Sequence, residues 1–475
     1  MTGLARRRGA RIVPPLLGML LYAVTLVGTY VYDDIPVVAQ DPRVTDPALW
    51  GRFFTESYNG NVDNLWRPVA SFSFAIQAQI HGASEGAAVF FHAMNVLLYG
   101  GVIALVQLFA ARLSDWRIGA VVGLLFAAHP VHVEAVAGLV GRAELLCGLG
   151  MFGALALLVA DRPLTWWRSL SIAGLTLLSV GAKEQGLVLP ALFVAWALLR
   201  RQRPWRLAGC VGVPLLAYLI YREMTLSFRW DRSLLDPAIQ PLILADGRDR
   251  WLIPVALLGR ATQLLLAPWA LSLDYGMHVI TPRQSLADPY LWLGVATLAL
   301  WSVGLGVALA KRHAAEAFAL LGLAIGYLPA SNGPTVIGTI FGERLLFLPS
   351  AFFILYLCLL ARRLPPRVAT GLLAVALLAG SAQTLRYALL WTDRLALYEH
   401  QADARPESVR SWLLLADGHR LAGDLDRAAD AARRATDLAP EQWRAWEKRA
   451  TIARERGRVD EAESHARKVA ELRGG

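Results

Sequence analysis

Residues 12–31 read IVPPLLGMLLYAVTLVGTYV, and this uncharged stretch is followed almost at once by the acidic pair Asp33-Asp34. About 20 apolar residues, at a rise of ~1.5 Å each, are enough for one helix to cross a bilayer. Two adjacent carboxylates at the mouth of such a helix are not typical of a simple anchor. With the polar loop that follows, they indicate a site at the membrane boundary.

Composition places most of the chain in lipid. Apolar residues make up 56% of the 475 residues and charged residues only 18%, which favours a membrane protein over a water-soluble core. The formal net charge of +10 is carried by short basic clusters between apolar runs. This pattern is typical of cytoplasmic loops and argues against nucleic-acid binding. Cys147, Cys210 and Cys358 have no paired spacing, so neither a disulfide framework nor a zinc site is indicated.

The basic clusters also orient the chain. With the N-terminus inside, about 11 apolar runs are expected to cross the membrane: 12–31, 87–111, 118–136, 145–160, 169–182, 186–199, 207–221, 289–310, 314–330, 344–361 and 367–386. The inside loops are then all basic: 6–11, 112–117, 162–168, 200–206, 311–312 and 362–367. The first run has no small-residue cleavage site after it, so we expect a retained helix.

One further apolar stretch, 251–272, is interrupted by Pro254, Arg260 and Pro268. If it crossed, the basic loops 311–312 and 362–367 would fall outside. We therefore expect it to lie at the interface, and we expect the C-terminus outside.

The sequence predicts an all-α protein: a polytopic membrane bundle over 1–390, with a large outer loop at about 32–86, and a short helical solenoid over 391–475. The C-terminal part repeats with a period of 34, so that Trp412 matches Trp446 and Gly423 matches Gly457. This period is typical of tetratricopeptide (TPR) repeats, which are helical hairpins. We expect the repeats to lean on the membrane domain and to offer a groove to an acceptor protein; a purely structural cap is the alternative.

The expected topology places charged groups from distant parts of the chain on one outer face. They are Asp33-Asp34, Trp66-Arg67-Pro68, the segment 129–144, Lys183-Glu184 and Glu343-Arg344. Charges beside membrane spans are costly unless they are paired or face water, so their accumulation on one face indicates a functional site.

Two imidazoles and a carboxylate lie within this face: His129, His132 and Glu134. A metal site is conceivable, but Pro130 disrupts the helical face that would aim both rings at one ion. We therefore favour substrate binding or a hydrogen-bonded loop. The acidic pair Asp33-Asp34 could serve as a general base or as a metal ligand.

The same motifs, in the same order, resemble the transmembrane and tetratricopeptide-repeat O-mannosyltransferases over nearly the whole chain. The strings that carry the resemblance are Tyr-Val-Tyr-Asp33-Asp34, Trp66-Arg67-Pro68, Phe-His92-Ala-Met-Asn95, His129 to Leu146, Ala-Lys183-Glu184-Gln185-Gly and Gly-Glu343-Arg344-Leu-Leu-Phe-Leu-Pro-Ser. The string from His129 to Leu146 is the most specific. Family members usually carry a longer repeat array.

The resemblance implies a GT-C-type glycosyltransferase, which passes a sugar, mannose in this family, from a polyprenyl-phosphate carrier to a hydroxyl on the non-cytoplasmic face, with inversion. It implies Asp34 as the general base and Asp33 as the second carboxylate. A positioned carboxylate activates a poor hydroxyl nucleophile, while a phosphodiester leaving group needs only cations. No cofactor is required, although a divalent metal is permitted. The expected substrate- or phosphate-binding residues are Arg67, His129, His132, Glu134, Arg142, Glu144, Lys183, Glu184, Glu343 and Arg344.

Alternatives remain at this point. The acceptor could be a cell-envelope glycan or lipid instead of a protein Ser or Thr, or the chain could be a non-catalytic membrane scaffold whose repeats recruit partners. A transporter would need charged or broken helices near the bilayer midplane and an inverted repeat. The charges here cluster at one face instead, which disfavours a transporter. The Arg-, Ala- and Leu-rich composition favours a bacterial inner membrane with the site facing outward; in a eukaryote the site would face the lumen of the endoplasmic reticulum.

Overall fold

The computed structural model describes residues 3–58, 65–202, 205–226, 235, 237–276 and 278–474, and within these ranges every regular element is helical. The all-α fold is therefore confirmed. The side chains of 1–7 and 203–208 fall outside the description, and with them Arg6, Arg7, Arg203 and Arg206, which we expect at the cytoplasmic end.

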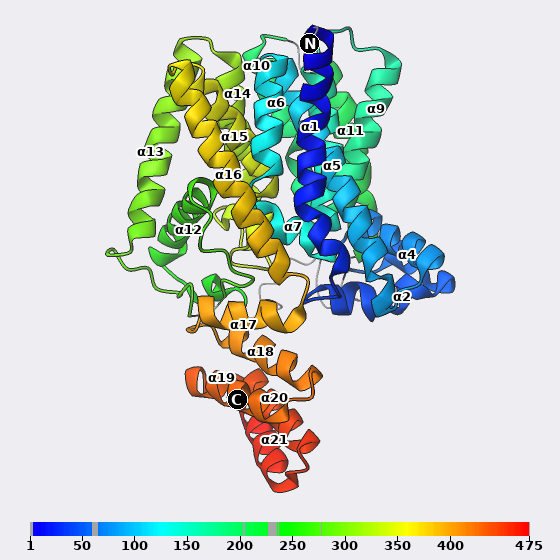
Figure 1. The fold of residues 1–475 in the computed structure, drawn as a ribbon, viewed down its shortest axis with the longest axis vertical. Coiled ribbons are helices and arrows are strands. Elements are labelled where there is room, and N and C mark those ends of the chain that lie inside the picture. Colours follow the sequence, from blue (N-terminus) through cyan, green and yellow to red (C-terminus); the bar gives the residue numbers. More distant parts are fainter. Residues whose placement is uncertain are drawn as a thin grey trace.

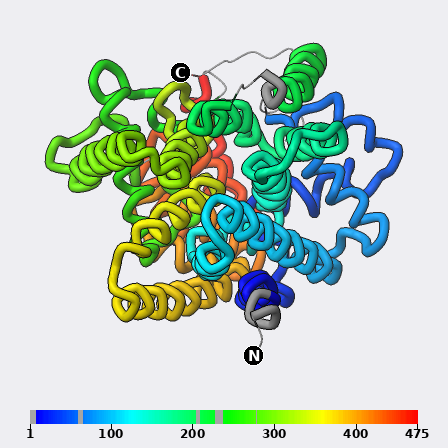
Figure 2. Tube along the Cα trace, turned by 90° about the horizontal axis from the view of Figure 1, so that it is seen from above, coloured from blue at the N-terminus to red at the C-terminus, as the bar shows by residue number. Residues whose placement is uncertain are grey.

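A bundle of long helices forms the body of the molecule (Figure 1). Its helices are α1 (Gly3–Tyr22), α5 (Ala88–Leu113), α6 (Trp116–Ala127), α8 (Arg142–Leu158), α9 (Trp166–Ala182), α10 (Leu189–Leu199), α11 (Trp205–Leu226), α13 (Pro289–Ala310), α14 (Ala314–Tyr327), α15 (Phe347–Ala361) and α16 (Pro366–Leu390). In lipid, a helix is the simplest structure that satisfies every backbone hydrogen bond within its own segment. Seen from the N-terminal end, α1 lies at the rim of the bundle beside α5 and α6 (Figure 2).

Among the described residues, seven helical segments are long and apolar enough to span a membrane, or eight if the bent pair is one span. The pair is α6 and the segment Pro130–Ala137, which contains α7 (Val133–Ala137); the two halves meet at an angle of 60°. Several such spans indicate a multi-pass membrane protein. Our count of about 11 crossings depends on α9, α10 and α11 as well, and stays a prediction.

Helix α12 (Asp249–Leu266) covers most of the interrupted stretch 251–272. This helix occupies only the lower half of the bundle in Figure 1, beside the full-length α13. The two pack backbone to backbone at Gly259 and Gly294, where an added Cβ would overlap a carbonyl oxygen of the facing helix. Small residues allow this close approach between helices in membranes.

The end of the bundle opposite the N-terminus carries short helices and loops. The first of these loops contains α2 (Pro42–Thr45), α3 (Arg52–Thr55) and α4 (Pro68–His81). At the other end, basic side chains join neighbouring turns: Arg362 pairs with Asp115 at 3.2 Å and Arg363 pairs with Glu316 at 2.6 Å. These pairs place Arg362 and Arg363 at the end that we expect to be cytoplasmic.

The C-terminal part follows α16 as five helices beneath the bundle (Figure 1): α17 (Arg394–Ala404), α18 (Val409–Leu421), α19 (Leu425–Leu438), α20 (Trp443–Glu455) and α21 (Val459–Gly474). The period of 34 is visible in its details. The indole N–H of Trp412 donates to the Pro406 carbonyl at 2.8 Å, and that of Trp446 donates to the Pro440 carbonyl at the same distance. The two hairpins, α18–α19 and α20–α21, are therefore equivalent units. Their assignment to the TPR class stays a prediction.

Candidate active site

The two carboxylates of the acidic pair after α1 have different surroundings, and Asp34 is the buried one. Tyr32, immediately before it, has a left-handed backbone with φ of 51°. Asp34 is only 1% exposed, and its carboxylate accepts hydrogen bonds from the backbone N–H groups of Val140 (3.0 Å) and Val31 (3.4 Å). Burial raises the pKa of the Asp34 carboxyl to about 7, although the backbone donors oppose the rise. Asp34 thus connects the loop after α1 to the segment that precedes α8.

Asp33, in contrast, is accessible. Its side chain is 34% exposed and accepts a hydrogen bond from Arg344 Nη1 at 3.2 Å. Arg344 also lies 3.4 Å from Glu134 through Nε, and its backbone N–H donates to Glu134 at 2.8 Å. A cation is therefore held between two carboxylates, one of which faces the open side.

Two further ion pairs lie around this group. Lys183 and Glu144 form a contact in which both side chains are almost fully buried. Arg67 donates from Nε and Nη2 to Glu184, each at 3.1 Å, and its guanidinium lies 5.0 Å from the centre of the Tyr58 ring. The Glu144 carboxylate interacts attractively with both Arg67 and Arg344, so the three pairs form one charged network.

The buried pair gives a stability prediction. In Glu144→Gln, the Lys183 ammonium loses its charged partner, and we expect a loss of about 3–5 kcal/mol in the free energy of unfolding. In Glu144→Leu/Lys183→Met both charges are gone, so most of the loss should be recovered. Thermal unfolding in detergent measures both. A double variant that is less stable than the single one would show that the pair does not act as a unit.

Arg142 belongs to the scaffold of the site and does not reach its open side. It is fully buried, and its guanidinium donates to Asn95 Oδ1 (2.9 Å) and the Phe91 carbonyl (3.0 Å) while stacking on Phe74 with 4.2 Å to the ring centre. Its donors are occupied by the chain itself. Two of our expected phosphate-binding cations are thus buried and bound by the chain: Arg142 and, in its pair with Glu144, Lys183.

The two histidines also bond to the chain itself, His132 in the interior and His129 half-buried. His132 is fully buried; its Nδ1 lies 2.9 Å from the Tyr99 hydroxyl, and its Nε2 lies 2.8 Å from Ser350 Oγ. His129 Nδ1 accepts from the Val131 N–H at 3.3 Å at the start of the turn that Pro130 opens. These contacts match our interpretation of a hydrogen-bonded loop. Among the residues that the structure describes, no group of three or more His, Cys, Asp or Glu side chains could hold a metal ion.

Glu343, next to Arg344, serves a neighbouring loop. It is fully buried, and its Oε1 accepts hydrogen bonds from the Tyr275 hydroxyl at 2.9 Å and from the Ser272 N–H. Sequence reasoning missed this loop, because nothing in its local pattern marks it. It also missed Asp274, which pairs with Arg410 of α18 at 3.1 Å.

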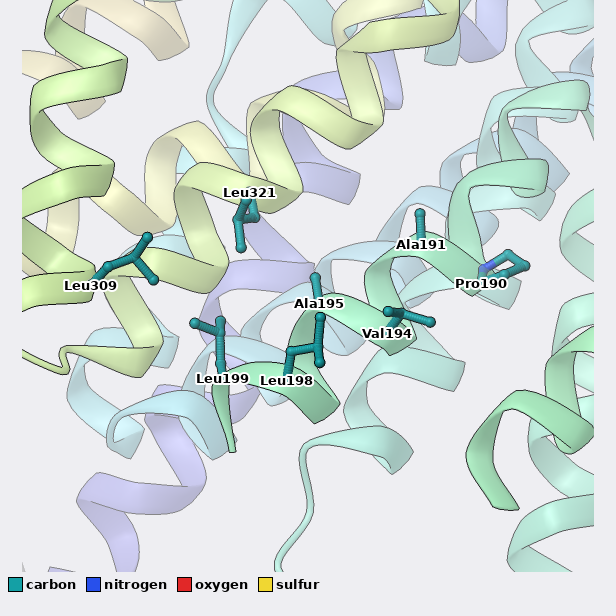
Figure 3. A pocket seen from close by; sticks show the side chains of 8 residues that line it. All are labelled: Pro190, Ala191, Val194, Ala195, Leu198, Leu199, Leu309 and Leu321. Carbon is teal, nitrogen blue, oxygen red and sulfur yellow. The ribbon is translucent and has the colours of Figure 1, made fainter. Parts of the chain in front are cut away.

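An apolar hollow of about 640 Å³ opens along α10 (Figure 3). Its walls come from α10, from Leu309 of α13 and from Leu321 of α14. Helix α10 begins shortly after the Lys183-Glu184 segment. The hollow is therefore lined by the helix that follows the Lys183-Glu184 segment in the chain.

This arrangement can bind an anion and accept a proton. Arg344 and Arg67 are both partly exposed cations, and an anion that approaches them competes with carboxylates for guanidinium donors. Asp33 lies directly beside Arg344. A phosphate and a hydroxyl nucleophile could therefore meet at this place.

Comparison with known proteins finds homologues over most of the chain, and they are TMTC-family protein O-mannosyltransferases at 25–28% identity. The protein O-mannosyl-transferase F38B6.6 of Caenorhabditis elegans is 26% identical over 412 residues, which is 83% of this chain and 57% of the relative. TMTC4 of Mus musculus is 27% identical over 415 residues, covering 72% and 54%. A stretch of 139 residues is 39% identical to Tmtc2 of Drosophila melanogaster, covering 27% and 14%.

The chain spans about half the length of the curated relatives it matches. No family model matches it. No solved structure matches it either.

Proposed function

We propose that this homologue of the TMTC proteins is an integral-membrane glycosyltransferase that transfers a sugar, mannose by analogy with its relatives, from a polyprenyl-phosphate carrier to a hydroxyl on the non-cytoplasmic face. The acceptor that we favour is a protein Ser or Thr. Support comes from the O-mannosyltransferase homologues. The observation that carries the proposal is the partly exposed Asp33 carboxylate held 3.2 Å from Arg344.

We assign the general base to Asp33 and not to Asp34. A base must come within hydrogen-bond reach of the proton that it takes, and geometry precedes pKa in this choice. Asp33 is open on one side, whereas Asp34 is buried and bound by backbone N–H groups. Asp34 then has a positioning role for the loop that carries Asp33.

The reaction is a single displacement. The acceptor oxygen attacks the anomeric carbon, the bond from that carbon to the phosphate oxygen breaks, and the hydroxyl proton passes to Asp33. The leaving polyprenyl phosphate keeps the electron pair, and Arg344 and Arg67 stabilise its charge. One displacement inverts the anomeric carbon. We propose that the chain's own cations are sufficient and that no divalent metal is needed.

The apolar hollow along α10 is where we place the isoprenoid chain of the carrier. All eight lining side chains are apolar, from Pro190 to Leu321. Lipid tails are as apolar as these side chains, so an isoprenoid in the hollow is stabilised by close packing and not by transfer out of water.

Filling the hollow tests this placement. We expect Ala195→Trp to raise the KM for a long polyprenyl carrier about three- to tenfold, with little effect on a carrier of two isoprene units, because only the long chain reaches the hollow. The measurement is transfer rate against carrier concentration for both lengths. Leu300→Trp, on the lipid-facing side of α13, is the matched control. An equal effect on both carriers would contradict the placement.

We further propose about 11 crossings, with α9, α10 and α11 as spans, α12 at the interface and the C-terminal helices outside. The equivalent hairpins α18–α19 and α20–α21 support their assignment as TPR repeats that bind acceptor protein. In a bacterium this topology puts the site on the outer face of the inner membrane.

The experiment that tests the proposed function is label transfer from radiolabelled polyprenyl-phosphate mannose in membranes that express the chain. Label on protein would support it. Label on a glycan or lipid would keep the mechanism and change the acceptor. No transfer from any lipid-linked sugar, with the chain inserted, would contradict the enzyme. EDTA should leave transfer unchanged.

A further inference from the structure

The backbone just before the acidic pair is unusual and needs support. Tyr32 has φ of 51°, a left-handed conformation that non-glycine residues rarely adopt. Strained residues of this kind persist only where their surroundings hold them in place. Because Tyr32 directly precedes Asp33, whatever holds its backbone also sets the direction of the Asp33 side chain.

The support comes from α17, more than 360 residues away in the chain. The Tyr32 N–H donates to the Tyr398 hydroxyl at 3.1 Å. Arg394 of the same helix donates to the Tyr30 carbonyl from Nε at 3.2 Å and from Nη2 at 2.8 Å. Helix α17 therefore forms hydrogen bonds with the backbone at two points immediately before the acidic pair.

Helix α18 adds a cation at the same place. The Arg410 guanidinium lies 5.1 Å from the centre of the Tyr32 ring and pairs with Asp274 at 3.1 Å. Its charge attracts the Asp33 carboxylate and repels the Arg344 guanidinium. Arg410 thus influences both members of the Asp33–Arg344 contact.

The other side of the contact is held by the same helices. Gln401 of α17 accepts hydrogen bonds from the Leu273 N–H at 2.7 Å and from the Ser272 hydroxyl at 3.1 Å. The Ser272 N–H in turn donates to Glu343, the residue before Arg344. The segments that carry Asp33 and Arg344 are therefore both anchored to α17 and α18.

We infer that α17 and α18 are a built-in part of the active site, in which Tyr398 and Arg410 are positioning residues that hold Asp33 toward Arg344. This inference rests on the proposed function for its catalytic meaning. It differs from a role of the C-terminal helices in acceptor binding alone, because it concerns the catalytic carboxylate itself.

Kinetics of the full-length protein give the first test. We expect Tyr398→Phe, which lacks the accepting hydroxyl, and Arg410→Met each to lower kcat about tenfold, because a misplaced catalytic group loses its favourable geometry. The KM for the lipid donor should stay within about twofold. Arg410→Lys keeps a cation at the Tyr32 ring and beside Asp274, so it should recover most of the rate. Arg362→Met is the matched control, since it removes an arginine from an ion pair with Asp115 at the opposite end of the bundle, and it should keep full activity.

Hydrogen exchange gives a second test that does not depend on sugar transfer. In Tyr398→Phe the Tyr32 amide loses its acceptor, so peptides that cover 30–36 should exchange faster than in the native protein and in Arg362→Met. Faster exchange with a lowered kcat supports the inference. Unchanged exchange, or unchanged kcat in both variants, overturns it. If the native chain transfers no sugar but exchange still responds, the proposed function fails while the anchoring of the acidic loop stands, and the catalytic meaning of the inference falls with the function.

Discussion

Asp33→Asn is expected to lower sugar transfer at least 100-fold, whereas Asp34→Asn should keep a substantial part of the native rate. The amide that replaces the Asp33 carboxylate cannot take up the acceptor's proton, and loss of a general base typically costs a factor of about 10²–10⁴. Asp34 has a pKa raised to about 7 by burial, so at neutral pH a large share of it is already uncharged. An asparagine in place of Asp34 keeps one oxygen for the Val140 N–H.

The two variants control for each other, because they are adjacent and equal in size. Both should insert and reach the same level in membranes, and rates are compared per amount of folded protein. If Asp34→Asn is inactive and Asp33→Asn is active, the base is Asp34, and the assignment of Asp33 is wrong.

Arg344→Gln is expected to be the second most damaging change at the site, with kcat lowered about 100-fold or more. Arg344 holds Asp33 at 3.2 Å and Glu134 at 3.4 Å, and it is also a cation available to the leaving phosphate. Its loss therefore removes both the positioning of the base and stabilisation of transition-state charge. The kcat of Arg344→Lys should lie between those of the native protein and of Arg344→Gln, since a point charge cannot bind two carboxylates with the same fork geometry.

Arg363→Gln is the matched control for this change. It removes an arginine from an ion pair with Glu316 at the opposite end of the bundle, and we expect kcat to stay within about twofold. A comparable fall in both variants would mean that loss of an ion pair, not its place, lowers the rate. An Arg344→Gln variant with native kcat and raised KM for the donor would leave Arg344 a role in ground-state binding only.

Much of the site was predictable, but not the task of each residue. The sequence predicts that charged groups near residues 33, 67, 134, 183 and 344 share a face, because basic inside loops determine which helix ends lie together. In the structure these groups interact with one another. It does not reveal which carboxylate of the pair is open. That depends on the backbone angle at Tyr32, which no propensity of a tyrosine indicates.

Arg142 is a second residue whose role cannot be predicted from the sequence. By residue type and place it is as good a phosphate ligand as Arg344. In the structure Asn95 and a backbone carbonyl take its donors, and Phe74 covers its face. Whether an arginine binds a substrate or stabilises the protein depends on which neighbouring groups accept its hydrogen bonds, and those neighbours come from other helices.

The amino-acid sequence by itself determined the helical class, the apolar segments, the basic clusters between them and the 34-residue period, because each depends on local composition or spacing. Only the tertiary structure decided that Asp33 meets Arg344 across 311 residues of chain, that Asp34 is buried, and that α17 and α18 hold the acidic loop. The physical reason is that these are contacts between distant segments. Their geometry follows from packing and from the burial of charge, neither of which can be read from the spacing of residues along the chain.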